Sequence, residues 1–297
     1  MITRQGMSLP SRRQFLMSGA AIAGGLATAG RAQTSYASVS GVKVRDCMWL
    51  WGTLPNIHES DIKKISKITA IEAAEYLGIP NMIMGGGILP SEAAASTVQS
   101  CKRVLWKLDS YQNYFLPEMA SIHALAGKYP HIEAVMIDDL TSVAIGERKM
   151  PPSQIAKIAY ALQREPRPLT LWGTVYTMNL GAPNLKDYLN LLNVVDLWVW
   201  RAADIPQLRE TFNTYEKISG DKPTVLGLYM FDFGDRKPMP VNLMESQCEL
   251  ALDLLKKDRI TGIVFLSSAV CDVGLDAVQW TKEWIASVAD QMLPPAS

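Results

Sequence analysis

Residues 131–140 are His131-Ile132-Glu133-Ala134-Val135-Met136-Ile137-Asp138-Asp139-Leu140. The apolar part of this stretch is short, rich in β-branched residues and bounded by polar ones, which predicts a strand buried on both faces, as in a parallel sheet. Ligands of such sheets bind outside the carboxyl ends of the strands. Two carboxylates there cost free energy that a purely structural position does not require. We therefore expect Asp138 and Asp139 at the floor of an active site.

The rest of the chain repeats this pattern, because short apolar runs alternate with amphipathic stretches eight times from Asp46 onward. We predict strands over 47–53, 81–84, 103–109, 131–140, 169–177, 195–201, 224–232 and 260–267. The predicted helices cover 57–77, 91–100, 114–127, 152–163, 184–192, 205–219, 241–257 and 275–292. Eight strand–helix units in a single domain of about 250 residues are typical of a (β/α)8 barrel. The alternative is a doubly wound open sheet. It usually has a glycine-rich phosphate turn after its first strand, and Trp51-Gly52-Thr53-Leu54-Pro55 is not one.

The N-terminal 37 residues predict an export signal. Ser11-Arg12-Arg13-Gln14-Phe15-Leu16 matches the twin-arginine motif, and an apolar segment rich in alanine and glycine follows it. That segment is too short to span a bilayer stably. We expect cleavage after Ala32 or Ala37, so that residues 1–37 are signal peptide and short linker and residues 38–297 are the barrel domain. The mature protein would be periplasmic or secreted in a bacterium, with the twin-arginine export machinery as its partner in transit and no stable membrane anchor.

Composition narrows the function further. The 297 residues are 48% hydrophobic and 20% charged with a net charge of zero. Cleavage after Ala32 would remove four arginines and no acidic residue, which leaves the mature chain with a net charge of −4. No basic patch argues for nucleic acid as a partner. Proteins exported through the twin-arginine route fold before transit, in a reducing cytoplasm. We therefore expect buried thiols rather than disulfides at the four cysteines, Cys47, Cys101, Cys248 and Cys271.

In such a barrel the chemistry lies at the carboxyl ends of the strands. Carboxylates and aromatic rings dominate these ends, and the candidates are Trp51, Lys107, Asp109, Asp138, Asp139, Trp172, Tyr176, Trp200, Arg201, Tyr229 and Asp232. Histidine is scarce: His58 is in a loop, His123 is mid-helix, and His131 begins a strand. Metal-dependent barrel hydrolases need several histidine ligands, so zinc hydrolysis is disfavoured. The chain has no nucleotide fingerprint either, and we expect neither a metal nor an organic cofactor.

Sugar chemistry fits this inventory. Hydrolysis of a glycosidic bond needs two carboxyl groups, and sugar rings pack on Trp and Tyr while their hydroxyls bond to Asp, Lys and Arg. Over the whole mature domain the chain resembles the barrel-type glycoside hydrolases, with Ile137-Asp138-Asp139-Leu140 as the one local motif. Such barrels often carry an essential acid at the end of strand four. Their commonest group has glutamates there and after strand seven, whereas this chain has aspartates at both places.

The resemblance implies an enzyme that cleaves a carbohydrate, and the twin-arginine motif predicts that it is exported. We expect Asp138 or Asp139 as an essential carboxylate, with Asp232 as its partner and Asp109 in reserve. Consecutive strand residues point to opposite sides, so only one of the adjacent pair would face the lumen directly. Adjacent carboxylates raise one pKa, which suits a general acid. The remaining candidates would bind substrate: Lys107, Asp109, Trp51, Trp172, Tyr176, Trp200, Arg201 and Tyr229.

Several alternatives stay open. The adjacent aspartates would otherwise cap the next segment or bind a lysine, Asp232 would be a turn residue, and any of the tryptophans would be barrel core. Two other functions are also compatible with the sequence. One is a non-catalytic carbohydrate-binding barrel. The other is a lyase, isomerase or oxidoreductase with a divalent metal on Asp109, Asp138 and Asp139, since oxygen ligands suit magnesium, calcium or manganese.

Overall fold

The structure, a computed structural model, describes residues 41–56, 62, 64–108, 116–141, 150–164 and 167–294. The strands of its main sheet are β1 (Met48–Gly52), β2 (Asn81–Met84), β3 (Arg103–Leu108), β4 (Ile132–Ile137), β5 (Thr170–Tyr176), β6 (Val194–Trp198), β7 (Thr224–Tyr229) and β10 (Gly262–Leu266). The α-helices whose bounds are described are α1 (Ala70–Leu77), α2 (Glu92–Thr97), α3 (Leu116–Lys128), α5 (Pro152–Ala161), α6 (Leu185–Leu189), α7 (Leu208–Ser219), α8 (Val241–Lys256) and α9 (Asp276–Val288), and they alternate with the strands. Shorter elements are the 3-10 helices η1 (Val44–Cys47), η3 (Thr177–Asn179), η4 (Ala202–Gln207) and η5 (Ser268–Val270), and the hairpin strands β8 (Phe231–Asp232) and β9 (Lys237–Pro238).

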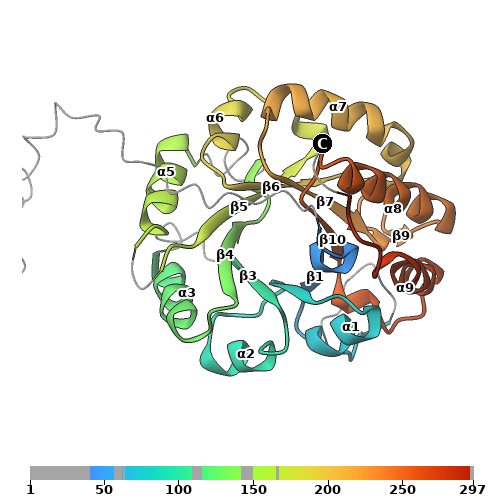
Figure 1. Cartoon of the computed structure of the whole chain (residues 1–297), viewed down its shortest axis with the longest axis horizontal. Helices are drawn as coiled ribbons and strands as arrows, with labels where there is room; N and C mark the ends of the chain where they lie inside the picture. The colour runs from blue at the N-terminus through green and yellow to red at the C-terminus, as the bar shows by residue number, and fades with distance from the viewer. Residues whose placement is uncertain are drawn as a thin grey trace, which may run out of the picture. The chain divides into compact units, whose positions relative to one another are not determined.

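The eight parallel strands close into a ring with the helices outside it (Figure 1). Closure is made by β1, which pairs in parallel with both β2 and β10, so that Trp51 lies opposite Ile83 on one side and Leu266 on the other. The predicted (β/α)8 barrel is therefore confirmed, and the open doubly wound sheet is wrong. The predicted signal peptide, residues 1–37, lies outside the described residues.

The first helix is shorter than its apolar pattern predicts. The sequence predicts a helix over 57–77, but α1 begins at Ala70, and residues 64–69 are not helical. The reason is a capping box: Thr69 Oγ1 accepts a hydrogen bond from the Glu72 amide, and the Glu72 carboxylate accepts one from the Thr69 amide at 2.8 Å. These reciprocal bonds satisfy amide groups that open a helix, and so they fix where it starts.

Two strands end earlier than predicted. β6 ends at Trp198 rather than at Arg201. Arg201 instead precedes η4, which begins at Ala202. β7 ends at Tyr229 rather than Asp232. Phe231 and Asp232 instead pair antiparallel with Pro238 and Lys237 in a separate two-stranded sheet. Asp232 therefore belongs to a hairpin that follows the barrel strand.

The barrel interior is filled by indole rings. Trp49 on β1 meets Trp172 on β5 with ring centroids 5.2 Å apart, and Trp51 on β1 meets Trp198 on β6 at 6.1 Å. These strands are not neighbours in the ring, so the contacts cross the interior. Gly227 on β7 makes room for this packing, because a Cβ there would overlap the Trp198 ring.

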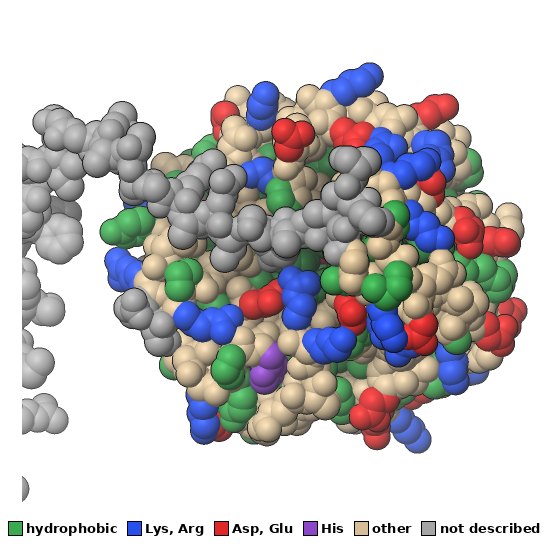
Figure 2. All heavy atoms as spheres, in the orientation of Figure 1, with side chains coloured by type: hydrophobic (Ala, Val, Ile, Leu, Met, Phe, Trp, Pro, Cys, Tyr) green, Lys and Arg blue, Asp and Glu red, His purple; other side chains and the backbone are tan. Residues whose placement is uncertain are grey.

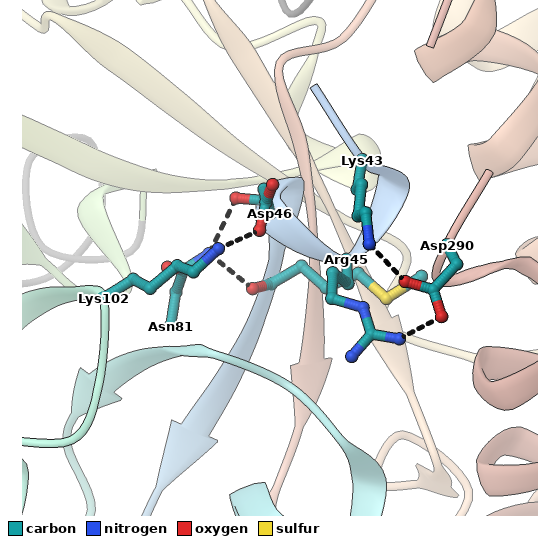
Figure 3. A network of polar contacts seen from close by, with 7 residues as sticks. Lys43, Arg45, Asp46, Asn81, Lys102 and Asp290 are labelled. Atoms are coloured by element: carbon teal, nitrogen blue, oxygen red, sulfur yellow. Dashed lines mark hydrogen bonds and ion pairs between the residues drawn. The ribbon is translucent and has the colours of Figure 1, made fainter. Parts of the chain in front are cut away.

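The amino ends of the strands are tied to the last helix by ion pairs. Asp290, just after α9, contacts Lys43 Nζ at 2.9 Å and Arg45 Nη2 at 2.8 Å (Figure 3). Asn81 on β2 donates hydrogen bonds to the Asp46 and Met48 carbonyls at 2.9 and 2.8 Å. This end of the barrel is thus held by contacts between segments far apart in the sequence.

On the face that Figure 2 shows, basic and acidic side chains are interspersed over the outer helices, so neither sign of charge dominates what is drawn there. The four cysteines are buried and free of disulfides, as expected. In the part of the chain that the structure describes, no helix is both long and apolar enough to cross a bilayer.

Candidate functional site

An ion pair joins the carboxyl ends of two neighbouring strands. Lys107 is on β3, Asp138 directly follows β4, and the two strands pair in parallel. Lys107 Nζ lies 3.2 Å from Asp138 Oδ2, with the two side chains 17% and 19% exposed. Burial raises the pKa of Asp138 above its ordinary value, Lys107 opposes that rise, and the neighbouring Asp139 adds to it. A carboxyl with a raised pKa is suited to donating a proton.

Asp139 differs from its neighbour in backbone and in partners. Its φ of 49° lies in the left-handed region, so the extended backbone of β4 has ended. Its amide donates to Asp138 Oδ1 at 2.8 Å, and its own Oδ1 accepts a 2.6 Å hydrogen bond from the Tyr176 hydroxyl on β5. Strand alternation therefore does not fix the direction of the Asp139 carboxyl, which contacts Tyr176 on β5, while Asp138 contacts Lys107 on β3. Among the described residues, no hydrogen bond is made to Asp139 Oδ2.

Four aromatic rings continue from Tyr176 around the strand ends. Tyr176 contacts Trp200 at 5.6 Å, Trp200 contacts Tyr229 at 5.9 Å, and Tyr229 contacts Trp198 at 4.7 Å, each between ring centroids. We call Tyr176, Trp200, Tyr229 and Trp198 the aromatic chain. Burial raises the pKa values of Tyr176 and Tyr229 above the ordinary phenol value, and the nearby aspartates act in the same direction. Both phenols therefore stay protonated over the neutral range, and Tyr176 keeps its donor for Asp139.

The tryptophan candidates differ in how exposed their rings are to a ligand. Trp200 is half-buried, whereas Trp51 and Trp172 are 5% and 1% exposed. Trp172 also donates its indole N–H to Thr170 Oγ1, at the start of β5. Both buried tryptophans pack inside the barrel, so of these three only Trp200 offers its surface as a sugar platform.

Among the described residues, neither Asp232 nor Arg201 makes a hydrogen bond or ion pair with Lys107 or Asp138. Asp232 is fully buried, accepts the Asp235 amide at 3.1 Å and lies 3.9 Å from Lys237 Nζ. In the described part of the chain, these contacts within the hairpin are all that Asp232 makes at hydrogen-bond or ion-pair distance. Arg201 is 55% exposed and pairs with Asp204 at 3.1 Å. The structure therefore joins Asp138 and Asp139 to Lys107 and Tyr176, and gives Asp232 a turn-forming contact.

Asp109 and His58 lie outside the described residues. Within the described residues, no group of three or more His, Cys, Asp or Glu side chains could hold a metal ion.

The sequence-based candidates do not include Asp196, a fully buried carboxyl in the middle of β6. The signal for it is in the sequence, since an aspartate interrupts the apolar run Val194-Val195-Asp196-Leu197-Trp198. Burial raises its pKa well above the ordinary value, Trp198 lowers it in part, and Asp138 raises it further. Asp196 thus interacts with the carboxyl at the end of β4.

No protein-family model matches this chain, and no curated relative does either. Solved structures share its fold at low identity. A family 51 α-L-arabinofuranosidase from Bifidobacterium longum has a TM-score of 0.52 at 10% identity, covering 84% of this chain and 74% of that one. A GH99 endo-α-mannosidase from Bacteroides thetaiotaomicron has 0.53 at 9%, covering 82% and 97%. A xylanase and α-amylase inhibitor protein from Scadoxus multiflorus has 0.52 at 11%, covering 80% and 97%. At these identities the likeness shows the barrel fold alone.

Proposed function

We propose that this protein is an enzyme of the glycoside hydrolase type, which cleaves a carbohydrate at the carboxyl ends of its barrel strands. The observation that carries the proposal is the adjacent pair Asp138 and Asp139, whose carboxyls have different partners. Asp138 is partly buried, has a raised pKa and contacts Lys107. Asp139 accepts from Tyr176 and keeps one oxygen free of described partners. Two carboxyl groups in unlike environments are what glycoside cleavage requires.

In this proposal Asp138 protonates the leaving oxygen. Its raised pKa favours the acid form, and the Lys107 ammonium stabilises the anion that remains after transfer. Asp139, held by the hydrogen bond from Tyr176, acts at the anomeric carbon, either as the nucleophile or as the base that activates the attacking water. The half-buried face of Trp200 would carry a sugar ring. Because Asp232 is fully buried in its hairpin, we assign it no direct role in this scheme.

The test is turnover on a panel of aryl glycosides and polysaccharides by Asp138→Asn and Asp139→Asn. Loss of a positioned acid–base group lowers the rate by roughly a hundredfold to ten-thousandfold. Asp221→Asn, an exposed aspartate before β7, is the matched control and should keep its activity. Wild-type turnover in both site variants would refute the assignment.

A non-catalytic carbohydrate-binding barrel is the second candidate. It is favoured by the partners of Asp138, whose two oxygens are both engaged, one by the Asp139 amide and one by Lys107. The fold similarity to an inhibitor protein is compatible with it. This candidate predicts saturable sugar binding, without turnover, that persists in the Asp138→Asn variant. A metal-dependent reaction on Asp109, Asp138 and Asp139 would instead show a divalent metal in elemental analysis and loss of function in chelator.

We further infer from Ser11-Arg12-Arg13-Gln14-Phe15-Leu16 that the chain is exported by the twin-arginine route to the periplasm or beyond. Replacing Arg12 and Arg13 by lysine should leave the precursor in the cytoplasm in a fractionation experiment. Unchanged processing and export of that variant would contradict the inference.

A further inference from the structure

Asp196 lies inside the barrel, beneath the aromatic chain. It sits on β6 two residues before Trp198, on the same side of the strand, and Trp198 crosses the interior to Trp51. Its neighbours in register are Thr174 on β5 and Val225 on β7, neither of which carries a charge. The side chain is fully buried. An aspartate at this depth is unusual, because burial strongly disfavours the ionised form.

The Trp198 indole N–H lies near enough to the Asp196 carboxyl to lower its pKa in part, but the two groups do not meet at hydrogen-bond geometry, and neither has another partner among the described residues. Buried polar groups are nearly always paired, and an unpaired buried carboxylate is more costly than an unpaired carboxylic acid. The acid form is therefore the one compatible with this packing.

Asp196 is coupled to titratable groups on the strands around it. Asp138 at the end of β4 raises its pKa, and Asp196 in turn acts on the Tyr229 phenol on β7. Lys107 contacts Asp138, which gives that carboxyl a cation to ionise against. Lys107 therefore favours ionisation of Asp138, whereas no described cation contacts Asp196.

The aromatic chain connects this buried acid to the proposed site. Trp198 packs on Tyr229 at 4.7 Å, and Trp200 contacts both Tyr229 and Tyr176. Tyr176 holds Asp139 through its 2.6 Å hydrogen bond. A change in packing beneath Trp198 would therefore be passed to Asp139 through an unbroken series of direct contacts.

We propose that Asp196 is a positioning residue, whose neutral carboxyl lets Trp198 and Tyr229 pack in the barrel mouth and whose ionisation at alkaline pH releases them. Ionisation sends the proton to solvent and leaves a second negative charge near Asp138. That charge draws water into the interior and loosens the rings that support Tyr176. The catalytic consequence rests on the proposed function, but the protonation and the packing do not.

The first experiment needs no substrate. Infrared spectra of the full-length protein at neutral pH should contain the C=O stretch of a protonated carboxyl. Asp196→Asn and Asp196→Leu should each lose one component of this band, and Asp138→Asn should retain that component. Tryptophan near-ultraviolet circular dichroism should then show an alkaline transition in the wild type that both Asp196 variants lack. In Asp138→Asn, where the repelling charge is gone, the midpoint should fall by about one pH unit.

An ionised Asp196 at neutral pH, or the same alkaline transition in Asp196→Leu as in the wild type, would overturn the proposal. The leucine variant avoids a buried amide, so the test does not depend on the folding of Asp196→Asn. If the protein turns over a glycoside, Asp196→Asn should move the alkaline loss of kcat/KM to higher pH. If the alkaline fall of kcat/KM occurred at the same pH in Asp196→Asn as in the wild type, the positioning role would be refuted. If no glycoside is cleaved, the proposed function fails while the spectroscopic result still decides the state of Asp196.

Discussion

The Tyr176 hydroxyl donates a 2.6 Å hydrogen bond to Asp139 Oδ1 across the ends of the neighbouring strands β5 and β4. Tyr176→Phe removes this donor and keeps the ring that packs on Trp200. A hydrogen bond to a carboxylate contributes enough that the kcat of the proposed glycoside cleavage should fall about tenfold to a hundredfold. Tyr215→Phe is the control, since Tyr215 is also buried and bonds Thr224 at the opposite end of the barrel. Equal losses in steady-state rate for the two variants would mean that the Tyr176 bond serves stability only.

The Lys107–Asp138 ion pair predicts a pH effect with a definite sign. The folded-state pKa of Asp138 is raised, so the stability linked to its protonation is present below its unfolded pKa and lost as pH rises through the folded value. Lys107 limits that rise. Lys107→Met should therefore raise the pKa of Asp138 further and extend the loss of stability to higher pH.

The measurement is urea unfolding of Lys107→Met and wild type at several pH values from acid to alkaline. The control is Lys102→Met, because Lys102 is 60% exposed and pairs with Asp46 at the other end of the barrel. An exposed pair contributes little, so its pH profile should match the wild type. A Lys107→Met profile parallel to the wild type would contradict the assigned coupling.

The architecture was accessible from the sequence because eight apolar runs of strand length alternate with amphipathic stretches, a pattern that does not depend on detailed contacts. Element ends were less accessible. The apolar spacing of Ile65 and Ile68 suggests a helix continuing into α1, yet Ile65 is 53% exposed and precedes the helix. The decisive signal is Thr69-x-x-Glu72, which sets the start locally and overrides the periodicity.

Only part of the candidate site could be predicted from the sequence, because side-chain contacts between strands depend on how the strands pair. The position of Asp138 follows from the end of a strand, but its contact with Lys107 depends on the pairing of β3 with β4, which shifts register between Val104 and Leu105. Alternation places a tryptophan inside a barrel without giving its depth. Trp172 and Trp200 therefore resemble each other in sequence, although one is core and the other reaches the strand ends.

The capping box gives a stability prediction that is independent of function. Thr69→Ala removes the acceptor for the Glu72 amide at the start of α1 and should lower the free energy of unfolding by about 1 kcal/mol. Thr69→Ser keeps a hydroxyl at the same position and should retain most of that stability. Urea unfolding of both variants checks the difference. Equal stability of the alanine and serine variants would show that the cap does not stabilise this helix.

The contact between Gly227 and the Trp198 ring gives the last prediction. A Cβ on Gly227 would overlap that ring, which is confined by Trp51 across the barrel and by Tyr229. Overpacking of a fixed core typically costs about 1–3 kcal/mol, so Gly227→Ala should lower the free energy of unfolding by at least that range.

Gly181→Ala is the matched control, because a Cβ there meets no atom within 4 Å. It should change the free energy of unfolding by no more than about 0.5 kcal/mol. Gly227→Ala should also alter the tryptophan near-ultraviolet signal, since the added methyl would shift the Trp198 ring against Trp51 and Tyr229. If Gly227→Ala were as stable as Gly181→Ala and had the wild-type spectrum, Trp198 would not be packed against β7, and the path from Asp196 to the strand ends would be lost with it.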